Sequence, residues 1–133
     1  MSKKKILVID DESNIRKMLK TLLELNNYQV ELGENGKDGI EKMTKVHPDL
    51  VLLDLVMPEL TGYQVLEKMN EDESLKSIPV ILFTAAPPDI AVQAGSQAID
   101  AVDYVLKPFD RMTLNFLLNR IGELTQANND PKE

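Results

Sequence analysis

The sequence predicts a doubly wound α/β fold, in which a five-stranded parallel sheet carries helices on both faces. Three observations support this prediction: apolar runs typical of buried strands, weaker runs typical of edge strands, and amphipathic segments typical of helices between them. Strands that alternate with helices along a chain form parallel sheets with right-handed crossovers. The 133 residues suffice for one such domain and leave no room for a second.

Five segments are predicted strands, and their patterns distinguish central from edge positions. Unbroken apolar runs, which are typical of strands covered on both faces, occur at residues 6–9, 50–53 and 80–83. Residues 28–32 alternate apolar with polar side chains, and the run at residues 104–106 is very short. We therefore expect the first three segments at the centre of the sheet and the last two at its edges.

Apolar residues at helical spacing predict helices between and after the strands. The clearest stripes run through residues 15–23, 65–69 and 114–124. Asp110, which precedes the last stripe, belongs to a residue type that often caps helices. The pattern is weaker over residues 40–46 and weakest over 90–98, where glycine and serine lower the helix propensity. Because the last residues lose the stripe, we expect a domain over residues 1–124 and a polar tail over 125–133.

Composition and charge exclude several classes of function. The chain has no cysteine, so we expect neither disulfides nor a thiolate metal site, and we expect a cytoplasmic protein. No apolar run approaches the roughly 18 residues that a membrane-spanning helix needs, so no membrane association is expected. Fifteen basic and twenty-two acidic residues give a net charge of −7, which argues against direct nucleic-acid binding.

Polar side chains follow four of the five predicted strands. The first strand ends in Asp10 and Asp11, the third in Asp54, the fourth in Thr84 and the fifth in Lys107. In a doubly wound sheet, ligands bind outside the carboxyl ends of the strands, so these side chains are expected to line one crevice. Three converging carboxylates repel one another and need a proton or a cation between them. Oxygen ligands with few carboxylates favour Mg²⁺ as that cation.

A simpler interpretation is that Asp10 and Asp11 only cap the helix that follows them. Two adjacent aspartates after a buried strand, facing a third aspartate, favour the metal site instead. With the cation bound, Asp54 could act as a nucleophile toward phosphorus, because the metal neutralises charges that would repel a phosphoryl group.

The remaining polar groups suit the binding of the same phosphoryl group. Lys107 would bind one phosphoryl oxygen, and the Thr84 hydroxyl with a backbone N–H in the turn of Thr84 and Ala85 would bind another. A threonine at a strand end is common, so Thr84 taken alone does not indicate a site.

Four pieces of the sequence lie at strand ends in a recognisable order. They are ILVIDD at residues 6–11, DLVMPELTG at 54–62, Thr84 with Ala85, and DYVLKPF at 103–109. In these pieces the chain resembles, over about residues 4–124, the receiver domain of bacterial two-component response regulators, of the single-domain chemotaxis or sporulation-relay type. The resemblance implies a flavodoxin-like fold with strand order 2-1-3-4-5.

The resemblance also implies a phosphorelay function. Asp54 would accept a phosphoryl group from a phosphohistidine on a sensor histidine kinase or a phosphotransfer protein, with Mg²⁺ as the cofactor. Asp11 and Asp54 would bind the metal directly, Asp10 would bind it through water, and the Val56 carbonyl would complete the protein ligands. Such a domain catalyses only its own aspartate phosphorylation and dephosphorylation, so it is not expected to be an enzyme in the ordinary sense.

A conformational switch is a further implication of the resemblance. Thr84 would move toward the phosphoryl group and Tyr104 would turn inward. With or without this switch, Tyr104 is expected to be a half-buried aromatic of an edge strand. The change would alter the face made by residues 90–98, the last strand and the last helix, which would bind an unknown downstream protein target. The weak helix pattern over residues 90–98 suits a bistable element. A monomer, or a dimer that depends on phosphorylation, is expected.

Three positions refine or depart from the family pattern. The family usually has a glycine in the segment before Tyr104, and residues 100–104 of this chain lack one, which leaves the backbone of that loop open. Val56 and Ala86 occupy positions that tune the attack of water on the acyl phosphate in this family. Neither side chain can orient a water molecule, so we expect a long-lived phosphorylated form.

Three alternative functions fit the sequence less well than a phosphoacceptor does. A flavodoxin-like cofactor carrier needs a phosphate cradle rich in serine, threonine or glycine after the first strand, where this chain has Asp10, Asp11 and Glu12. A phosphohydrolase needs a further acid or base and a cap over its substrate, for which 133 residues leave little room. A scaffolding receiver that is not phosphorylated typically lacks the acceptor or the lysine, and both Asp54 and Lys107 are present.

Overall fold

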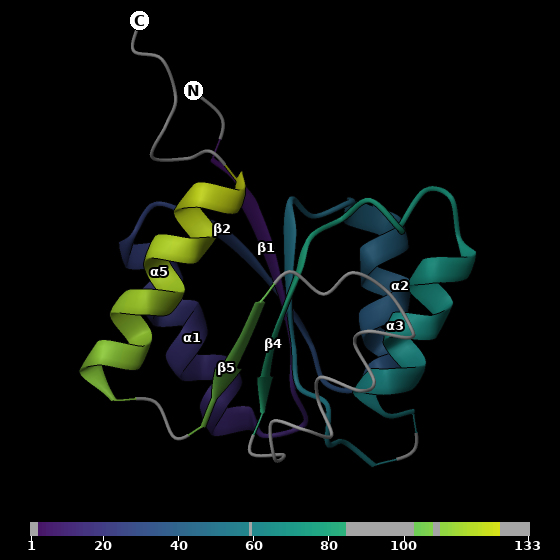
Figure 1. Cartoon of the computed structure of the whole chain (residues 1–133), viewed down its shortest axis with the longest axis horizontal. Coiled ribbons are helices and arrows are strands. Elements are labelled where there is room, and N and C mark those ends of the chain that lie inside the picture. Colours follow the sequence, from purple (N-terminus) through teal and green to yellow (C-terminus); the bar gives the residue numbers. More distant parts are fainter. Residues whose placement is uncertain (1–2, 59, 85–102, 108–109, 126–133) are drawn as a thin grey trace, which may run out of the picture.

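A computed structural model describes residues 3–58, 60–84, 103–107 and 110–125. In this part of the chain, parallel strands form one sheet in the order β2-β1-β3-β4-β5 (Figure 1). The strands are β1 (Lys5–Ile9), β2 (Gln29–Gly33), β3 (Leu50–Leu53), β4 (Val80–Thr84) and β5 (Asp103–Leu106). This is the order that the resemblance implied, and it places β2 and β5 at the edges, as their sequence patterns predicted.

Helices cover both faces of the sheet. They are α1 (Ser13–Leu25), α2 (Gly36–Val46), α3 (Gly62–Glu71) and α5 (Arg111–Thr125). Figure 1 shows α1 and α5 on one face and α2 and α3 on the other. The predicted doubly wound α/β fold of the flavodoxin-like type is therefore confirmed. The helix predicted over residues 90–98 lies outside the described residues.

Two apolar layers hold the helices to the sheet, because successive side chains of a strand point to opposite faces. Toward α1 and α5, β3 contributes Leu50 and Leu52, which pack with Phe83 of β4 in one buried cluster. Toward α2 and α3, β3 contributes Val51 and Leu53 to a second buried cluster. All four side chains of β3 are buried. Burial on both faces explains why the central strands are unbroken apolar runs.

Helix α2 begins four residues before the predicted range of 40–46. The Asn35 side chain caps it by accepting a hydrogen bond from the Asp38 N–H at 2.8 Å. Gly36 and Gly39 in the first turns concealed the helix, because glycine has low helix propensity. Packing requires a small residue at Gly39, where an added Cβ would lie 2.5 Å from Cδ1 of Ile9.

The end of α5 corrects the predicted boundary of the tail. Thr125 was assigned to the tail, but it is the buried last residue of α5. Its hydroxyl donates to the Ile121 carbonyl at 2.7 Å, and a side-chain hydrogen bond joins it to Tyr28. These contacts satisfy a polar residue in the core, which an apolar stripe cannot reveal. At the other end of α5, the predicted cap is confirmed, because the Thr113 N–H donates to Asp110 Oδ1 at 2.8 Å.

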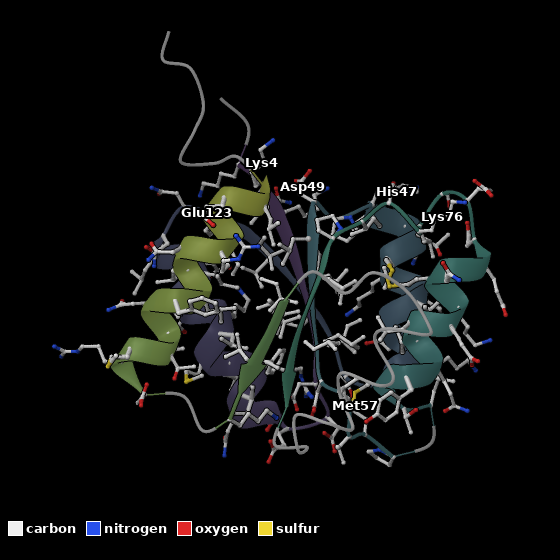
Figure 2. All side chains as sticks on the ribbon, in the orientation of Figure 1. Lys4, His47, Asp49, Met57, Lys76 and Glu123 are labelled. Atoms are coloured by element: carbon white, nitrogen blue, oxygen red, sulfur yellow. The ribbon has the colours of Figure 1, made fainter. Side chains whose placement is uncertain are left out.

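The two rims of the sheet carry different groups of side chains. Figure 2 shows Met57, which follows β3, at the rim where the strands end, and it shows Lys4, Asp49 and His47 at the opposite rim. The predicted site residues follow the strands and so belong to the rim of Met57. No helix among the described residues is long and apolar enough to cross a membrane.

Candidate functional site

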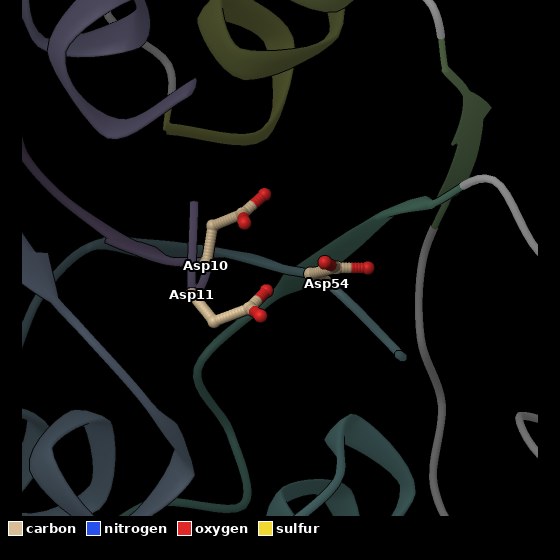
Figure 3. A group of neighbouring side chains, drawn as sticks. All are labelled: Asp10, Asp11 and Asp54. Carbon is tan, nitrogen blue, oxygen red and sulfur yellow. The ribbon is translucent and has the colours of Figure 1, made fainter. Parts of the chain in front are cut away.

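Three aspartates gather where β1 and β3 end. Carboxylate oxygens of Asp10, Asp11 and Asp54 all lie within 4.8 Å of one another. Figure 3 shows their side chains projecting to the same side of the neighbouring strand ends. Asp10 and Asp54 are buried, whereas Asp11 is exposed. The predicted cluster of carboxylates is therefore present, and it opens to solvent through Asp11.

The register of the sheet brings Asp10 and Asp54 side by side. Ile9 of β1 pairs with Leu53 of β3, and each aspartate is the next residue in its chain segment. The Asp54 N–H donates to the Ile9 carbonyl at 3.0 Å, which continues the pairing of β1 with β3 past the last strand residues. A slip of one residue would turn these side chains to the other face, so the apolar core that determines the register also positions the carboxylates.

Lys107, which comes from the edge strand β5 of the sheet, completes the cluster. It follows β5, and its Nζ lies 2.9 Å from Asp10 Oδ2 and 3.3 Å from Asp54 Oδ2. The side chain is only 13% exposed. The same ammonium lies 5.3 Å from the centre of the Phe83 ring. Lys107 thus lies in the same crevice as the aspartates, and its role toward a phosphoryl oxygen stays a prediction.

Burial and charge act against each other in this pocket. Burial raises the pKa of Asp10, although hydrogen bonds from Lys107 and from the Glu12 N–H partly offset it. Burial by itself would lower the pKa of Lys107, but the hydrogen bond to Asp10 and the charges of Asp10 and Asp54 outweigh it and raise that pKa. With all four groups ionised, three aspartates and one lysine leave a net charge of −2.

The donor set fits a magnesium ion. The three side chains of the cluster all offer carboxylate oxygens, which are the ligand type that Mg²⁺ prefers. A divalent cation would also balance the residual charge of −2. Asp10, Asp11 and Asp54 would hold the ion, and a bound Mg²⁺ neutralises charge on the oxygens of a transferring phosphoryl group. The role of the Val56 carbonyl as a further ligand stays a prediction.

The loop after β3 holds Asp54 by its main chain. The Val56 N–H donates to Asp54 Oδ1 at 3.2 Å. Leu55 and Met57 are buried, whereas the Val56 side chain between them is 60% exposed. The Gly62 N–H donates to the Leu55 carbonyl at 3.1 Å, so the start of α3 lies against the backbone of the loop. Asp54 is thus fixed between the sheet and the end of a helix.

Helix α3 begins with a capping box that secures the far end of this loop. The Thr61 hydroxyl accepts from the Gln64 N–H, and the Gln64 side chain accepts from the Thr61 N–H at 2.8 Å. This reciprocal pair satisfies two N–H groups that the helix leaves unbonded.

The other predicted site residues are placed only through their backbones or not at all. Thr84 is the last residue of β4 and pairs with Leu106, the residue before Lys107. Tyr104 lies in β5, in register with Leu82. The side chains of Thr84 and Tyr104, and the whole of Ala85, lie outside what the structure describes. Their predicted roles therefore stay predictions.

Two residues of this region had no predicted role. Glu12 contributes a carboxylate oxygen 3.3 Å from Lys107 Nζ, and the sequence signal for it is its position directly after the two aspartates. Arg16, on the first turns of α1, donates from Nη1 to the Asp10 carbonyl at 2.7 Å. No motif indicated Arg16, because its target is a main-chain oxygen. It ties α1 to the loop that carries the aspartate pair.

Comparisons with known proteins identify relatives of this chain. The family model for the response regulator receiver domain matches residues 6–119. The regulatory protein AtoC of Escherichia coli is 40% identical over 121 residues, which are 90% of this chain and 25% of AtoC. The probable transcriptional regulator ycf27 of Porphyridium aerugineum is 36% identical over 98% of this chain and 55% of its own length. The chain thus spans about half or less of these curated relatives.

Solved structures of similar length agree with this assignment. The Vibrio cholerae chemotaxis protein CheY4 superposes with a TM-score of 0.82 at 28% identity, covering 90% of this chain and 99% of its own. The response regulator TrrA of Thermotoga maritima, in complex with Mg²⁺–BeF, gives a TM-score of 0.77 at 34% identity and covers 91% of this chain and 98% of its own. Given these matches and the convergence of Asp10, Asp11, Asp54 and Lys107, the chain belongs to the response regulator receiver domain family of two-component signalling.

Proposed function

We propose that this chain is the phosphoacceptor of a two-component phosphorelay and that Asp54 takes the phosphoryl group with Mg²⁺ as the cofactor. The observation that carries the proposal is the placement of a lysine ammonium 3.3 Å from Asp54 Oδ2 beside a cluster of three carboxylates. Asp54 is buried enough to be oriented, and the exposed Asp11 leaves the cluster accessible to a donor. The family and the Mg²⁺–BeF complex of TrrA support the same chemistry.

In the proposed transfer, a carboxylate oxygen of Asp54 forms a bond to phosphorus. The P–N bond to the imidazole of a donor phosphohistidine breaks, and its electron pair leaves with the nitrogen, so no oxidant or reductant is needed. Lys107 binds one of the phosphoryl oxygens as a point charge, while the Thr84 hydroxyl and the Ala85 N–H donate to another. Asp11, Asp54 and the Val56 carbonyl would hold the metal ion directly, and Asp10 would hold it through water.

The proposed donor is a sensor histidine kinase or a phosphotransfer protein, and the proposed output is a change of surface for a downstream protein. Thr84 and Tyr104 move together in this switch, which alters the face formed by residues 90–98, β5 and α5. The domain acts on its own aspartate, in both phosphorylation and dephosphorylation, and turns over no other substrate. We further propose a cytoplasmic location, no direct nucleic-acid binding, and a monomer or a phosphorylation-dependent dimer.

Intact mass spectrometry tests the proposal. The protein is incubated with Mg²⁺ and acetyl phosphate or phosphoramidate, and one added phosphoryl group is expected. The adduct should vanish in Asp54→Asn and on chelation of Mg²⁺. Asp49→Asn is the matched control, because Asp49 is an exposed aspartate at the opposite rim and should leave the adduct unchanged. A wild-type protein without an adduct would favour a scaffolding receiver instead.

A further inference from the structure

Glu12 uses its side chain in an unusual way for its position. It is the N-cap residue of α1, but its side chain makes no capping hydrogen bond. Its own N–H donates to Asp10 Oδ1 at 2.8 Å, and its carboxylate Oε1 lies 3.3 Å from Lys107 Nζ. Residues at this position usually stabilise the helix by accepting from its first N–H groups. The Glu12 carboxylate is instead directed toward the proposed phosphoryl-binding site.

Lys107 is bound to three carboxylates that come from different parts of the chain. Its ammonium has three N–H donors and no acceptor. The acceptors are Asp10 Oδ2 at 2.9 Å, Glu12 Oε1 at 3.3 Å and Asp54 Oδ2 at 3.3 Å. Asp10 and Asp54 are buried members of the cluster of three aspartates, whereas the Glu12 side chain is 61% exposed and lies outside that cluster. All three donors of the ammonium therefore have a carboxylate before any phosphoryl group is present.

We propose that Glu12 is a positioning residue that acts through Lys107, by holding the ammonium before phosphorylation and competing with the phosphoryl group for it. This inference rests on the proposed function, in which Lys107 binds a phosphoryl oxygen on Asp54. To do so, the ammonium has to exchange at least one carboxylate for that oxygen. Glu12 is the partner that the ammonium can release without leaving a buried charge unpaired, because Glu12 is the exposed one of the three.

The expected effect is modest, because solvent screens the pair. An exposed ion pair changes an equilibrium by a factor of roughly two to five. Glu12→Gln should therefore speed phosphorylation of Asp54 by acetyl phosphate about two- to fivefold at saturating Mg²⁺. The removed negative charge also reduces repulsion of the anionic donor, so charge and position have to be separated by further variants.

Two variants separate these effects. Glu34→Gln makes the same change of charge at an exposed residue directly after β2, on the same rim, and Lys107 does not contact Glu34 in the described part of the chain. Glu12→Asp keeps the charge but shortens the side chain by one methylene, which withdraws the carboxylate from Lys107. If Glu12 competes with the phosphoryl group for Lys107, phosphorylation should be faster in Glu12→Asp and unchanged in Glu34→Gln. A charge effect alone predicts the reverse pattern.

The state of Lys107 provides a readout that does not depend on activity. The ¹⁵N–¹H signal of its ammonium is recorded without Mg²⁺ and assigned by its loss in Lys107→Arg. We expect the signal to shift and to exchange faster with water in Glu12→Gln and Glu12→Asp, and to stay unchanged in Glu34→Gln. An unchanged signal or unchanged rate in both Glu12 variants would refute the inference while wild-type phosphorylation still supported the proposed function. A wild-type protein that takes no phosphoryl group would refute both.

Discussion

A methyl group added at Gly62 should displace Asp54 without touching any catalytic side chain. The Cβ of Gly62→Ala would lie 2.3 Å from the Asp54 carbonyl oxygen and 2.6 Å from the Leu55 Cα. Non-bonded carbon atoms normally approach to about 3.5–4.0 Å, so the start of α3 and the loop have to separate by roughly 1 Å. Both contacted atoms belong to the main chain, so no change of rotamer can relieve the overlap.

The magnitude follows from two opposing contributions. Overpacking a closely packed site costs about 1–3 kcal/mol of unfolding free energy, and contact with backbone favours the upper part of that range. Replacing glycine by alanine in a helix returns up to about 1 kcal/mol. The net loss for Gly62→Ala is therefore about 1–2 kcal/mol, which corresponds to a decrease in Tm of about 5 °C. A displacement of about 1 Å at a reacting group can slow a reaction about 100-fold.

The assay combines thermal unfolding with the rate of phosphorylation by acetyl phosphate. Asn70→Ala is the matched control, because Asn70 is exposed on the same helix and its substitution adds no packed atom. Gly62→Ala should lose about 5 °C in Tm and at least tenfold in rate, whereas Asn70→Ala should keep the wild-type rate. Wild-type Tm and rate in Gly62→Ala would show that the contact between α3 and the loop does not hold Asp54 in place.

Two further predictions follow from Asp10 and Val56. Because burial raises the pKa of Asp10 above its ordinary value, the folded protein binds this proton more tightly than the unfolded chain. Without Mg²⁺, the free energy of unfolding should therefore decrease as the pH rises from the ordinary aspartate pKa through the raised value. At neutral pH, Asp10→Asn should raise the Tm measured without Mg²⁺ and should reduce the further increase in Tm on adding Mg²⁺. A lower Tm in Asp10→Asn would contradict this sign. The exposed Val56 side chain cannot orient a water molecule, so the phosphoryl group on the wild-type protein should persist far beyond seconds. Val56→Asn should shorten the lifetime of the phosphoryl group, which intact mass spectrometry can follow. A wild-type lifetime of seconds would refute this explanation.

The local pattern of the sequence was sufficient to predict the doubly wound α/β class and the central and edge strands, whereas the strand order came from the family resemblance. Runs such as residues 50–53 are buried on both faces of the sheet, and the alternating segment near β2 lies at its edge. These features follow from the spacing of apolar side chains, which depends on neighbours only a few positions apart. The predicted start of α2 was wrong because the sequence pattern counted Gly39 against a helix, whereas Gly39 is required there by its contact with Ile9, a residue of another element. Thr125 was misassigned because its contact with Tyr28 is also long-range in sequence, which no local pattern can show.

For the candidate site as well, local patterns predicted which residues take part, and long-range contacts decided their geometry. The sequence by itself determined which strands end in polar residues, and hence that Asp10, Asp11, Asp54 and Lys107 share one rim, because parallel strands end at the same edge. Only the tertiary structure decided how they meet: the pairing of β1 with β3 sets Asp10 beside Asp54, and the ammonium of Lys107 joins them to Glu12. Distances between groups that lie up to 97 positions apart depend on register and packing, which no local pattern contains.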